Sequence, residues 1–219
     1  MSMAAAVNAM EKIWSKGRPI STGIKLRLLE ACATSRLIYN AHCIPYTRAQ
    51  LDKVNSTHRR HIRRALGVYY PERISVPETY RRAEAEPLSV RIVKSRWTMF
   101  GHILRQRGTP ANQAMSEYFR VAKSRIITRR IRALTTLPKI LHSEILRLTE
   151  EQRSEHLGVT GMSSQHDLNE IWRKAQNRNT WRDTVELITE NEREFVEARD
   201  TSTSEKRITR TSNTNKERK

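Results

Sequence analysis

The chain has few of the residues on which disulfide-rich, β-rich and zinc-binding proteins depend. Among its 219 residues only two are cysteine, and glycine and proline occur seven times each. So little glycine and proline disfavours a protein built from many tight β-turns. No C-x-x-C pair and no zinc-knuckle spacing of Cys and His occurs, which excludes a zinc finger or zinc knuckle.

The two cysteines, Cys32 and Cys43, are eleven positions apart in a stretch for which we expect helix. A helical rise would separate them by ~16 Å, which is far beyond the reach of a disulfide bond. We therefore expect two buried, free thiols in a reducing compartment. This predicts an intracellular protein of the cytoplasm or the nucleus.

Long hydrophobic runs are also missing. No apolar stretch approaches the ~20 residues that cross a lipid bilayer. The opening residues MSMAAAVNAMEKIW lack the regions and cleavage pattern of a secretory signal peptide. The sequence therefore predicts no membrane partner.

Acidic residues do not form the patterns that catalysis needs. The four aspartates are scattered along the sequence, at Asp52, Asp167, Asp183 and Asp200. Two-metal phosphoryl or nucleotidyl transfer requires clustered carboxylates, and no Walker, G-x-S-x-G or dinucleotide-binding motif occurs. The histidines also lack carboxylate partners at metal-ligand spacing. We expect no catalytic residues, no metal, no cofactor and no enzymatic activity of this chain alone.

Helix-forming residues, by contrast, dominate the sequence, and we expect an all-α protein. Ser21 or Thr22 precedes a predicted helix that runs to about Ile44. The segments TRAQ (47–50) and SVPE (75–78) match the capping box that begins a helix. Gly67 is suited to end the helix between them. Later helices are expected at about 137–148, 164–175 and 181–188, with a break at Asn177–Asn179.

Charge of one sign is in excess: the net charge is +18 and the pI is about 10.6. Such an excess opposes compaction and calls for a polyanionic partner, most often nucleic acid. Residues 87–137 contain 11 Lys and Arg against Glu117 alone, whereas 138–199 are slightly acidic. The predicted division is a basic helical domain (1–107), a basic irregular connector (108–137), an acidic C-terminal helical unit (138–199) and a disordered basic tail (200–219).

Arginines gather on one side of the predicted helix over residues 48–66. The opposite side of this helix is apolar and includes His58, which is expected to be a core histidine. Like charges at this spacing repel, so they are not placed there to stabilise the helix. The alternative is a charged face that is merely solvated. The candidate nucleic-acid-binding residues are Arg59, Arg60, Arg63, Arg64, Arg81, Arg82, Arg91, Lys94, His102 and Arg105.

The segment RWTMFGHILRQR (96–107) divides into two sides on a helical wheel. Apolar positions gather around Trp97 and predict structural roles for Trp97, Phe100, Gly101 and Leu104. We expect Trp181 to be structural as well. Glycine at a buried helical position suggests close approach of a neighbouring backbone. His102 falls on the basic side, where it either contacts a phosphate or base or is an idle surface histidine.

Several segments, taken in order, resemble one protein family. IKLRLLEACATSRLIYNAHCI (24–44) resembles the helix that follows the polymerase palm in reverse transcriptases of non-LTR (LINE-type) retrotransposons. HRRHIRRALGV (58–68), ERISVPETYRRAEAEPL (72–88) and RWTMFGHILR (96–105) resemble the run that follows this helix, and AQNRNTWRDTV (175–185) resembles the closing motif. The resemblance covers roughly residues 20–188. His61 and Asn177 depart from the family's usual residues.

The resemblance implies that this chain corresponds to the thumb and the post-palm extension, with a helical thumb-like bundle in its first part. The palm and its metal-binding aspartates would belong to the parent RNA-directed DNA polymerase and not to this chain. The implied partners are template–primer or element RNA, as RNA or an RNA–DNA hybrid bound without sequence preference, and the missing palm domain. The alternative is a non-functional or repurposed remnant that acts as a helical protein-interaction module.

Overall fold

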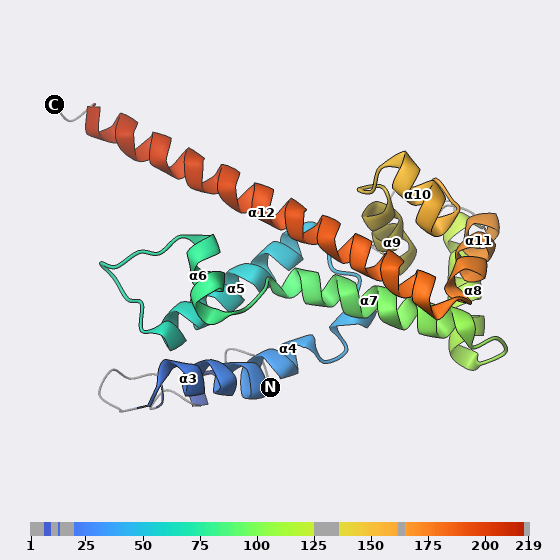
Figure 1. Cartoon of the computed structure of the whole chain (residues 1–219), viewed down its shortest axis with the longest axis horizontal. Helices are drawn as coiled ribbons and strands as arrows, with labels where there is room; N and C mark the ends of the chain where they lie inside the picture. The colour runs from blue at the N-terminus through green and yellow to red at the C-terminus, as the bar shows by residue number, and fades with distance from the viewer. Residues whose placement is uncertain (1–6, 10–12, 14–19, 125–135, 162–164, 217–219) are drawn as a thin grey trace. The chain divides into compact units, whose positions relative to one another are not determined.

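The computed structural model describes residues 7–9, 13, 20–124, 136–161 and 165–216. Within these ranges every regular element is a helix and no β-strand occurs (Figure 1). The expected all-α fold class is therefore confirmed.

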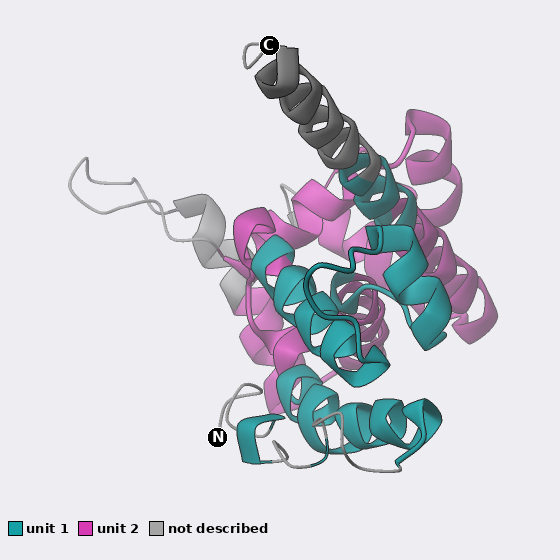
Figure 2. Cartoon of the chain, turned by 90° about the vertical axis from the view of Figure 1, so that its left-hand side faces the viewer, with its two compact units in different colours: residues 1–39, 52–89, 192–219 teal, residues 40–51, 90–191 magenta. Residues whose placement is uncertain are grey.

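The chain forms two compact units, and each is assembled from segments that are distant in sequence (Figure 2). Unit 1 contains residues 1–39, 52–89 and 192–219, and unit 2 contains residues 40–51 and 90–191. These boundaries differ from the predicted division at residues 107 and 138. The reason is that the apolar side of helix α7 (Leu88–Arg105) packs against the C-terminal helices, so the acidic segment does not fold as a unit of its own.

Unit 1 is built around the helix α5 (Arg48–Leu66), of which residues 52–66 belong to this unit. Its other elements are α3 (Thr22–Leu28), the π-helix η1 (Leu29–Thr34), α4 (Ser35–Ile38), α6 (Val76–Ala83) and the later part of α12 (Arg178–Lys216). Its buried core consists of Val7, Leu29, Ala33, Ile62, Ala65 and Tyr80. Asn55 and Ser89 form a buried polar pair in this unit. The Asn55 side-chain NH2 donates to the Ser89 hydroxyl, and the Asn55 side-chain oxygen accepts from the Ser89 N–H, each at 3.0 Å.

The first long helix ends earlier than the sequence predicts. Ser21 is its N-cap, but the helical run stops at Ile38 rather than near Ile44. Asn40 takes the left-handed conformation with φ 57°, which a helix cannot continue through. Cys43 therefore lies in the short 3-10 helix η2 (Ala41–Cys43). Both cysteines are free, as expected, but the prediction of burial is wrong, because Cys32 is half-buried and Cys43 is exposed.

The predicted capping residues begin and end their helices. Thr47 and Gln50 form a reciprocal capping box, with the Thr47 N–H donating to the Gln50 side chain at 2.7 Å. Gly67 follows α5 in the left-handed conformation, with φ 76°. At the second predicted box only half of the pattern forms: Ser75 accepts from the Glu78 N–H at 3.3 Å, whereas the Glu78 carboxylate turns to two arginines.

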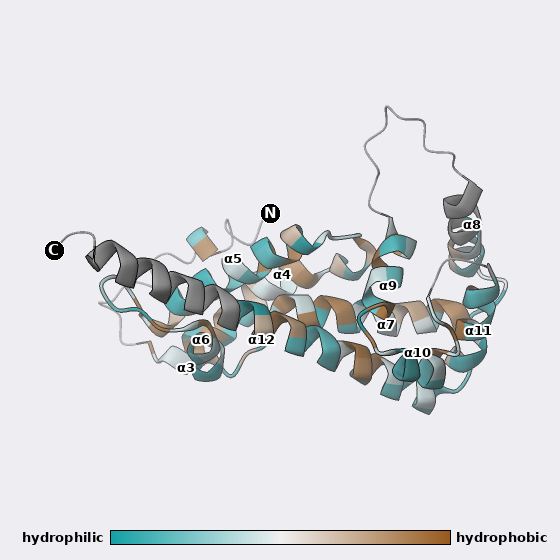
Figure 3. Ribbon diagram, turned by 90° about the horizontal axis from the view of Figure 1, so that it is seen from above, coloured by the Kyte–Doolittle hydropathy of each residue, from teal (hydrophilic) through white to brown (hydrophobic). Residues whose placement is uncertain are grey.

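Unit 2 contains most of the apolar core. Its helices are α7, α8 (Pro110–Ser124), α9 (Leu137–Ile145), α10 (Glu150–Leu157), α11 (Gln165–Ala175) and the first part of α12. Their buried residues form one cluster that includes Val93, Phe100, Leu104, Leu141, Ile145, Leu157, Leu168, Ile171, Val185 and Ile188. The ribbon of α7 alternates between apolar and polar colours in Figure 3, as expected for a helix with one buried side.

Helix α8 occupies a stretch that the sequence predicts to be an irregular connector. It begins where the Thr109 hydroxyl accepts from the Asn112 N–H at 3.3 Å, and Pro110 takes the first helical position. The Asn112 side chain also donates to the Ile103 carbonyl at 3.0 Å, which ties the turn to the end of α7. These local bonds favour helix despite the weak apolar pattern. Residues 125–135 of the predicted connector lie outside the described residues.

Helices α7 and α12 lie side by side in unit 2 and are joined by tryptophans. The indole N–H of Trp181 donates to the Trp97 carbonyl at 3.1 Å. The rings of Trp97 and Phe100 meet edge to face with centroids 5.7 Å apart, which is a favourable aromatic geometry. Gly101 faces the ring of Trp181 directly, so that a Cβ at this position would overlap the indole. The predicted close approach is thus made by a side chain and not by a backbone.

An ion pair is buried in the same unit. Arg96 and Glu144 are paired, with 2% and 4% of their side-chain surfaces exposed. The second carboxylate oxygen of Glu144 accepts from the Trp97 indole N–H at 2.8 Å, and Arg96 also donates to the Ile44 carbonyl at 3.3 Å. The charges are therefore hydrogen-bonded as well as paired, which is the condition under which burial of an ion pair is tolerated.

The helical backbone of α12 continues to Lys216, and the disordered tail that the sequence predicts over residues 200–219 stays a prediction. Side chains after Asp200 and all of residues 217–219 lie outside the described part of the chain.

Candidate nucleic-acid interface

Unit 1 contains an open hollow of about 680 Å³ beside helix α5. Helix α5 contributes Ser56, Thr57, Arg60, His61, Arg63 and Arg64, and the loop that follows it contributes Val68, Tyr69 and Tyr70. None of the described residues that line this hollow is acidic. We refer to it below as the α5 hollow.

The cationic side chains of the α5 hollow come from consecutive turns of one helix. Arg60 and Arg64 are four residues apart and so lie on the same side of α5, with Arg60 exposed and Arg64 half-buried. The hydroxyls of Ser56 and Thr57 lie one turn earlier in the helix. Guanidinium and hydroxyl groups are the donors that bind phosphate oxygens in nucleic-acid complexes. The composition of the hollow therefore fits a polyanion.

His61 is held in the wall of the α5 hollow and is only 8% exposed. Burial is the largest cause that lowers the pKa of its imidazole, and the charges of Arg60 and Arg64 lower the pKa further. The neutral imidazole is therefore the favoured form of His61, with one ring nitrogen that donates a hydrogen bond and one that accepts. Sequence reasoning assigned no role to His61; the signal that could have pointed to it is a histidine placed among arginines.

The lowered pKa of His61 predicts a stability that depends on pH. In the unfolded chain the imidazole of His61 becomes protonated near pH 6.5. In the folded chain it becomes protonated only at a lower pH, because its pKa is lowered. Between these two pH values the unfolded state therefore binds more protons. The free energy of unfolding should therefore fall as the pH drops below ~6.5. In urea titrations at several pH values, His61→Gln should flatten this dependence. Its control His166→Gln, at an exposed position, should keep it. An unchanged slope in His61→Gln would contradict the assignment.

Among the α5 arginines predicted to bind nucleic acid, Arg63 and Arg59 make bonds inside unit 1. The Arg63 guanidinium donates to the Thr79 hydroxyl at 3.1 Å and to the Ile74 carbonyl at 3.3 Å, so it fixes α6 and the preceding loop onto α5. Arg59 forms an ion pair with Asp200 at 3.6 Å and does not line the α5 hollow. The arginine side of α5 is thus divided between ligand-facing and structural positions.

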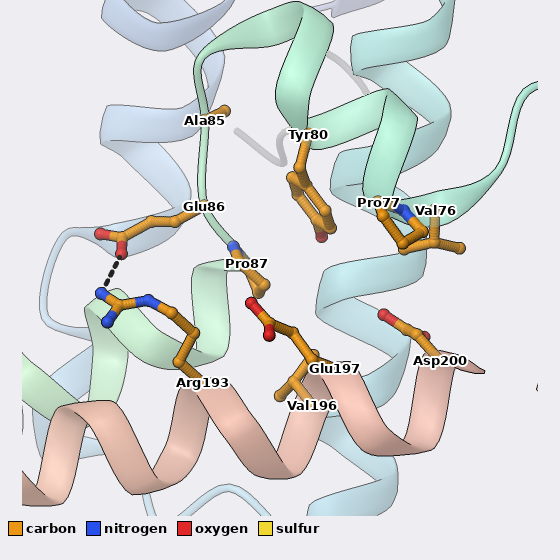
Figure 4. Close-up of a pocket in the computed structure, with 10 residues that line it drawn as sticks. All are labelled: Val76, Pro77, Tyr80, Ala85, Glu86, Pro87, Arg193, Val196, Glu197 and Asp200. Atoms are coloured by element: carbon orange, nitrogen blue, oxygen red, sulfur yellow. Dashed lines mark hydrogen bonds and ion pairs between the residues drawn. The ribbon is translucent and has the colours of Figure 1, made fainter. Parts of the chain in front are cut away.

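A second hollow of unit 1, of about 400 Å³, lies where α6 faces α12 (Figure 4). Three carboxylates line it, from Glu86, Glu197 and Asp200, and Arg193 pairs with Glu86 at 3.2 Å. Tyr80 lines it from α6, and burial raises the pKa of its hydroxyl. Because acidic groups outnumber basic ones among its lining residues, this hollow disfavours a polyanion.

Arg81 and Arg82, also predicted to bind nucleic acid, are both engaged by Glu78. Their guanidinium groups donate to its carboxylate at 2.7 and 2.6 Å. These hydrogen bonds lower the pKa of Glu78 to about 2 and raise the pKa of Arg81. Arg82 also pairs with Glu72 at 3.8 Å. These carboxylates offset part of the positive charge here, and neither arginine lines the α5 hollow.

The remaining predicted contacts belong to unit 2. Lys94 pairs with Glu186 at 2.7 Å, and Arg91 is half-buried. Arg105 donates to the Ala175 carbonyl at 3.1 Å, and its pKa is lowered by burial and by Arg178. His102 is exposed, whereas its neighbour Gly101 is buried. The structure thus gives Lys94 and Arg105 partners within their own unit.

The residues predicted to be structural are buried. Trp97, Phe100, Leu104 and Trp181 lie in the core of unit 2, and His58 is 3% exposed in unit 1, where its ring faces Tyr80 at 6.2 Å. What sequence reasoning missed is the pair Tyr69–Tyr70. The only signal for it was an aromatic pair directly after the helix-ending glycine.

No protein-family model, no curated protein and no solved structure matches this chain. Among the described residues no group of three or more His, Cys, Asp or Glu side chains is arranged to hold a metal ion. No helix in the part of the chain that the structure covers is both long and apolar enough to cross a membrane.

Proposed function

We propose that this chain binds nucleic acid through the α5 hollow, holding RNA or an RNA–DNA hybrid without sequence preference. The observation that carries the proposal is a concave surface with three arginines and no described acidic residue, in a chain of net charge +18. Arg60 is its principal phosphate contact because its side chain is exposed, and Arg64 supports it one turn away. Phosphate binding by such groups is independent of base sequence.

The larger protein to which such a chain would belong is a non-LTR retrotransposon reverse transcriptase, of which it would be the thumb and post-palm extension. The packing of the motif segments supports this part of the proposal. Trp97 of the RWTMFGHILR segment and Trp181 of the AQNRNTWRDTV segment are 84 positions apart, yet they bond and pack within one unit. The motif segments therefore include core positions of unit 2. Polymerase activity is not expected of this chain, and nucleotide incorporation in a primer-extension assay would contradict that.

The test is the affinity of the purified chain for labelled RNA, measured by fluorescence anisotropy over a range of salt concentrations. We expect the association constant to fall steeply between about 50 and 200 mM salt, because each phosphate that is neutralised releases counterions. Binding that ignores salt, or no binding at low salt, would overturn the proposed function.

Arg60→Gln locates the interaction at the α5 hollow. We expect a weaker association constant on every sequence tested and a salt slope that is smaller by about 1, the effect of one lost phosphate contact. Arg60→Glu should weaken binding further through repulsion.

Arg27→Gln is the matched control, since Arg27 is exposed on α3 in the same unit and does not line the hollow. Equal affinity of Arg60→Glu and wild type would place the nucleic acid elsewhere. If only binding to a protein partner changed, the chain would be an interaction module instead.

A further inference from the structure

Tyr70 leaves an unusually large aromatic surface in solvent. It is 86% exposed, on the loop between α5 and α6, and it lines the α5 hollow together with the half-buried Tyr69. A tyrosine so exposed contributes little to the core and leaves the faces of its ring available to a ligand. The same hollow carries Arg60 and His61 on the adjoining helix.

The loop that presents Tyr70 is tied down on both sides of it. Before it, the Val68 N–H donates to the Arg63 carbonyl at 2.9 Å. After it, the Ile74 carbonyl accepts from the Arg63 guanidinium at 3.3 Å. One arginine of α5 thus anchors the chain on either side of the tyrosine. A ring presented by an anchored loop loses less conformational freedom when a ligand covers it.

We infer that the α5 hollow binds single-stranded nucleic acid, with an unpaired base stacked on Tyr70 and the adjoining phosphate held by Arg60. The inference rests on the proposed function and names the form of nucleic acid that the same hollow takes. Aromatic platforms beside basic grooves are the arrangement by which proteins hold single strands without sequence preference, since every base has a π-face. The exposed ring of Tyr70 is available to a base, and the exposed guanidinium of Arg60 is available to a phosphate of the nucleic-acid backbone.

A duplex can use only half of this arrangement. Its bases are stacked on one another and are not available to Tyr70 except at the ends, whereas its phosphates remain available to Arg60. The two groups therefore make separable contributions: the arginine acts on any nucleic acid, and the tyrosine acts only on unpaired bases. A volume of about 680 Å³ is within the range of sites that enclose small organic ligands, which leaves room for a base and its sugar-phosphate.

The experiment compares three labelled probes on the full chain by fluorescence anisotropy at one low salt concentration. The probes are an unstructured oligo-uridine strand about 16 nucleotides long, an abasic strand with the same number of phosphates, and a blunt RNA duplex without a loop. Wild type should bind the uridine strand more tightly than the abasic strand. Tyr70→Ala should weaken binding of the uridine strand at least about fivefold, the lower end of the effect of losing one stacked base. It should leave binding of the abasic strand and of the duplex unchanged.

Two further variants make the outcome specific. Tyr70→Phe keeps the ring and should bind like wild type. Tyr39→Ala removes another exposed tyrosine of unit 1, 77% exposed and away from the hollow, and should change nothing. Unchanged binding of the uridine strand by Tyr70→Ala, or equal losses on all three probes, would overturn the stacking role. If wild type bound none of the probes, the proposed function would fail instead, so the two failures are distinguishable.

Discussion

Replacing Gly101 with leucine is expected to destabilise unit 2 by about 3 kcal/mol or more, the upper range for overpacking a closed core. A Cβ at position 101 would overlap the indole ring of Trp181, and the ring has little room to move because its N–H is bonded to the Trp97 carbonyl. Even Gly101→Ala should lower the free energy of unfolding, although alanine is favoured over glycine in a helix by ~1 kcal/mol. Thermal melting followed by circular dichroism measures both.

Gly23 provides the matched control for Gly101. It lies in helix α3, and a Cβ there would meet no atom within 4 Å. Gly23→Ala should therefore raise stability by up to ~1 kcal/mol, the ordinary helix-propensity gain. The double change of Gly101→Ala with Trp181→Leu should cost less than the sum of the single changes, because they share one contact. Strict additivity, or an unchanged melting temperature in Gly101→Leu, would contradict the packing described.

Replacing Glu144 with leucine is expected to cost about 3–5 kcal/mol, the range for removing one member of a buried ion pair. The change leaves the Arg96 guanidinium buried without its counter-charge and the Trp97 indole N–H without its acceptor. Urea denaturation should show the loss as a lower midpoint. The salt-dependent binding at the α5 hollow, which lies in the other unit, should persist wherever the variant is folded.

The partner substitution separates charge burial from packing. The double change of Arg96→Met with Glu144→Leu removes both charges and should recover much of the loss, since apolar replacements of buried pairs are often neutral or better. Glu186→Gln is the surface control, because its pair with Lys94 is about half exposed, and it should cost no more than ~1 kcal/mol. A double variant as unstable as Glu144→Leu alone would show that the network contributes through shape rather than charge.

Local signals account for the parts of the fold that the sequence predicted well. Asparagines at 177 and 179 predicted a break, and the Asn177 side chain accepts from the Asn179 and Thr180 N–H groups at 3.0 and 3.3 Å, which begins α12. The sequence also predicted the helix cap at Thr47 and the helix end at Gly67, which is left-handed. Each of these bonds joins residues within a few positions of one another, so their geometry is encoded locally.

The sequence predicted that the candidate site would be rich in arginine, but it could not predict which arginines would be available to a ligand. Arg59, Arg60, Arg63 and Arg64 are equivalent in a helical pattern, yet Arg63 bonds Thr79 and Ile74, and Arg59 pairs with Asp200. Those partners are 11 or more positions away. No periodicity reports such contacts, because they arise only when distant elements pack.

The sequence by itself determined an all-α chain, its helix caps, the buried side of α7 around Trp97 and a large excess of positive charge. These follow from side-chain periodicity, local hydrogen bonding and residue counts. The tertiary structure decided where the charge can act and what fills the space at Gly101. Arg63 bonds Thr79 and Arg59 pairs with Asp200, whereas Arg60 stays exposed in the hollow that Tyr70 also lines. At Gly101 the space is filled by Trp181 of α12. Which side chains meet depends on the packing of segments far apart in sequence, and no local pattern contains that information.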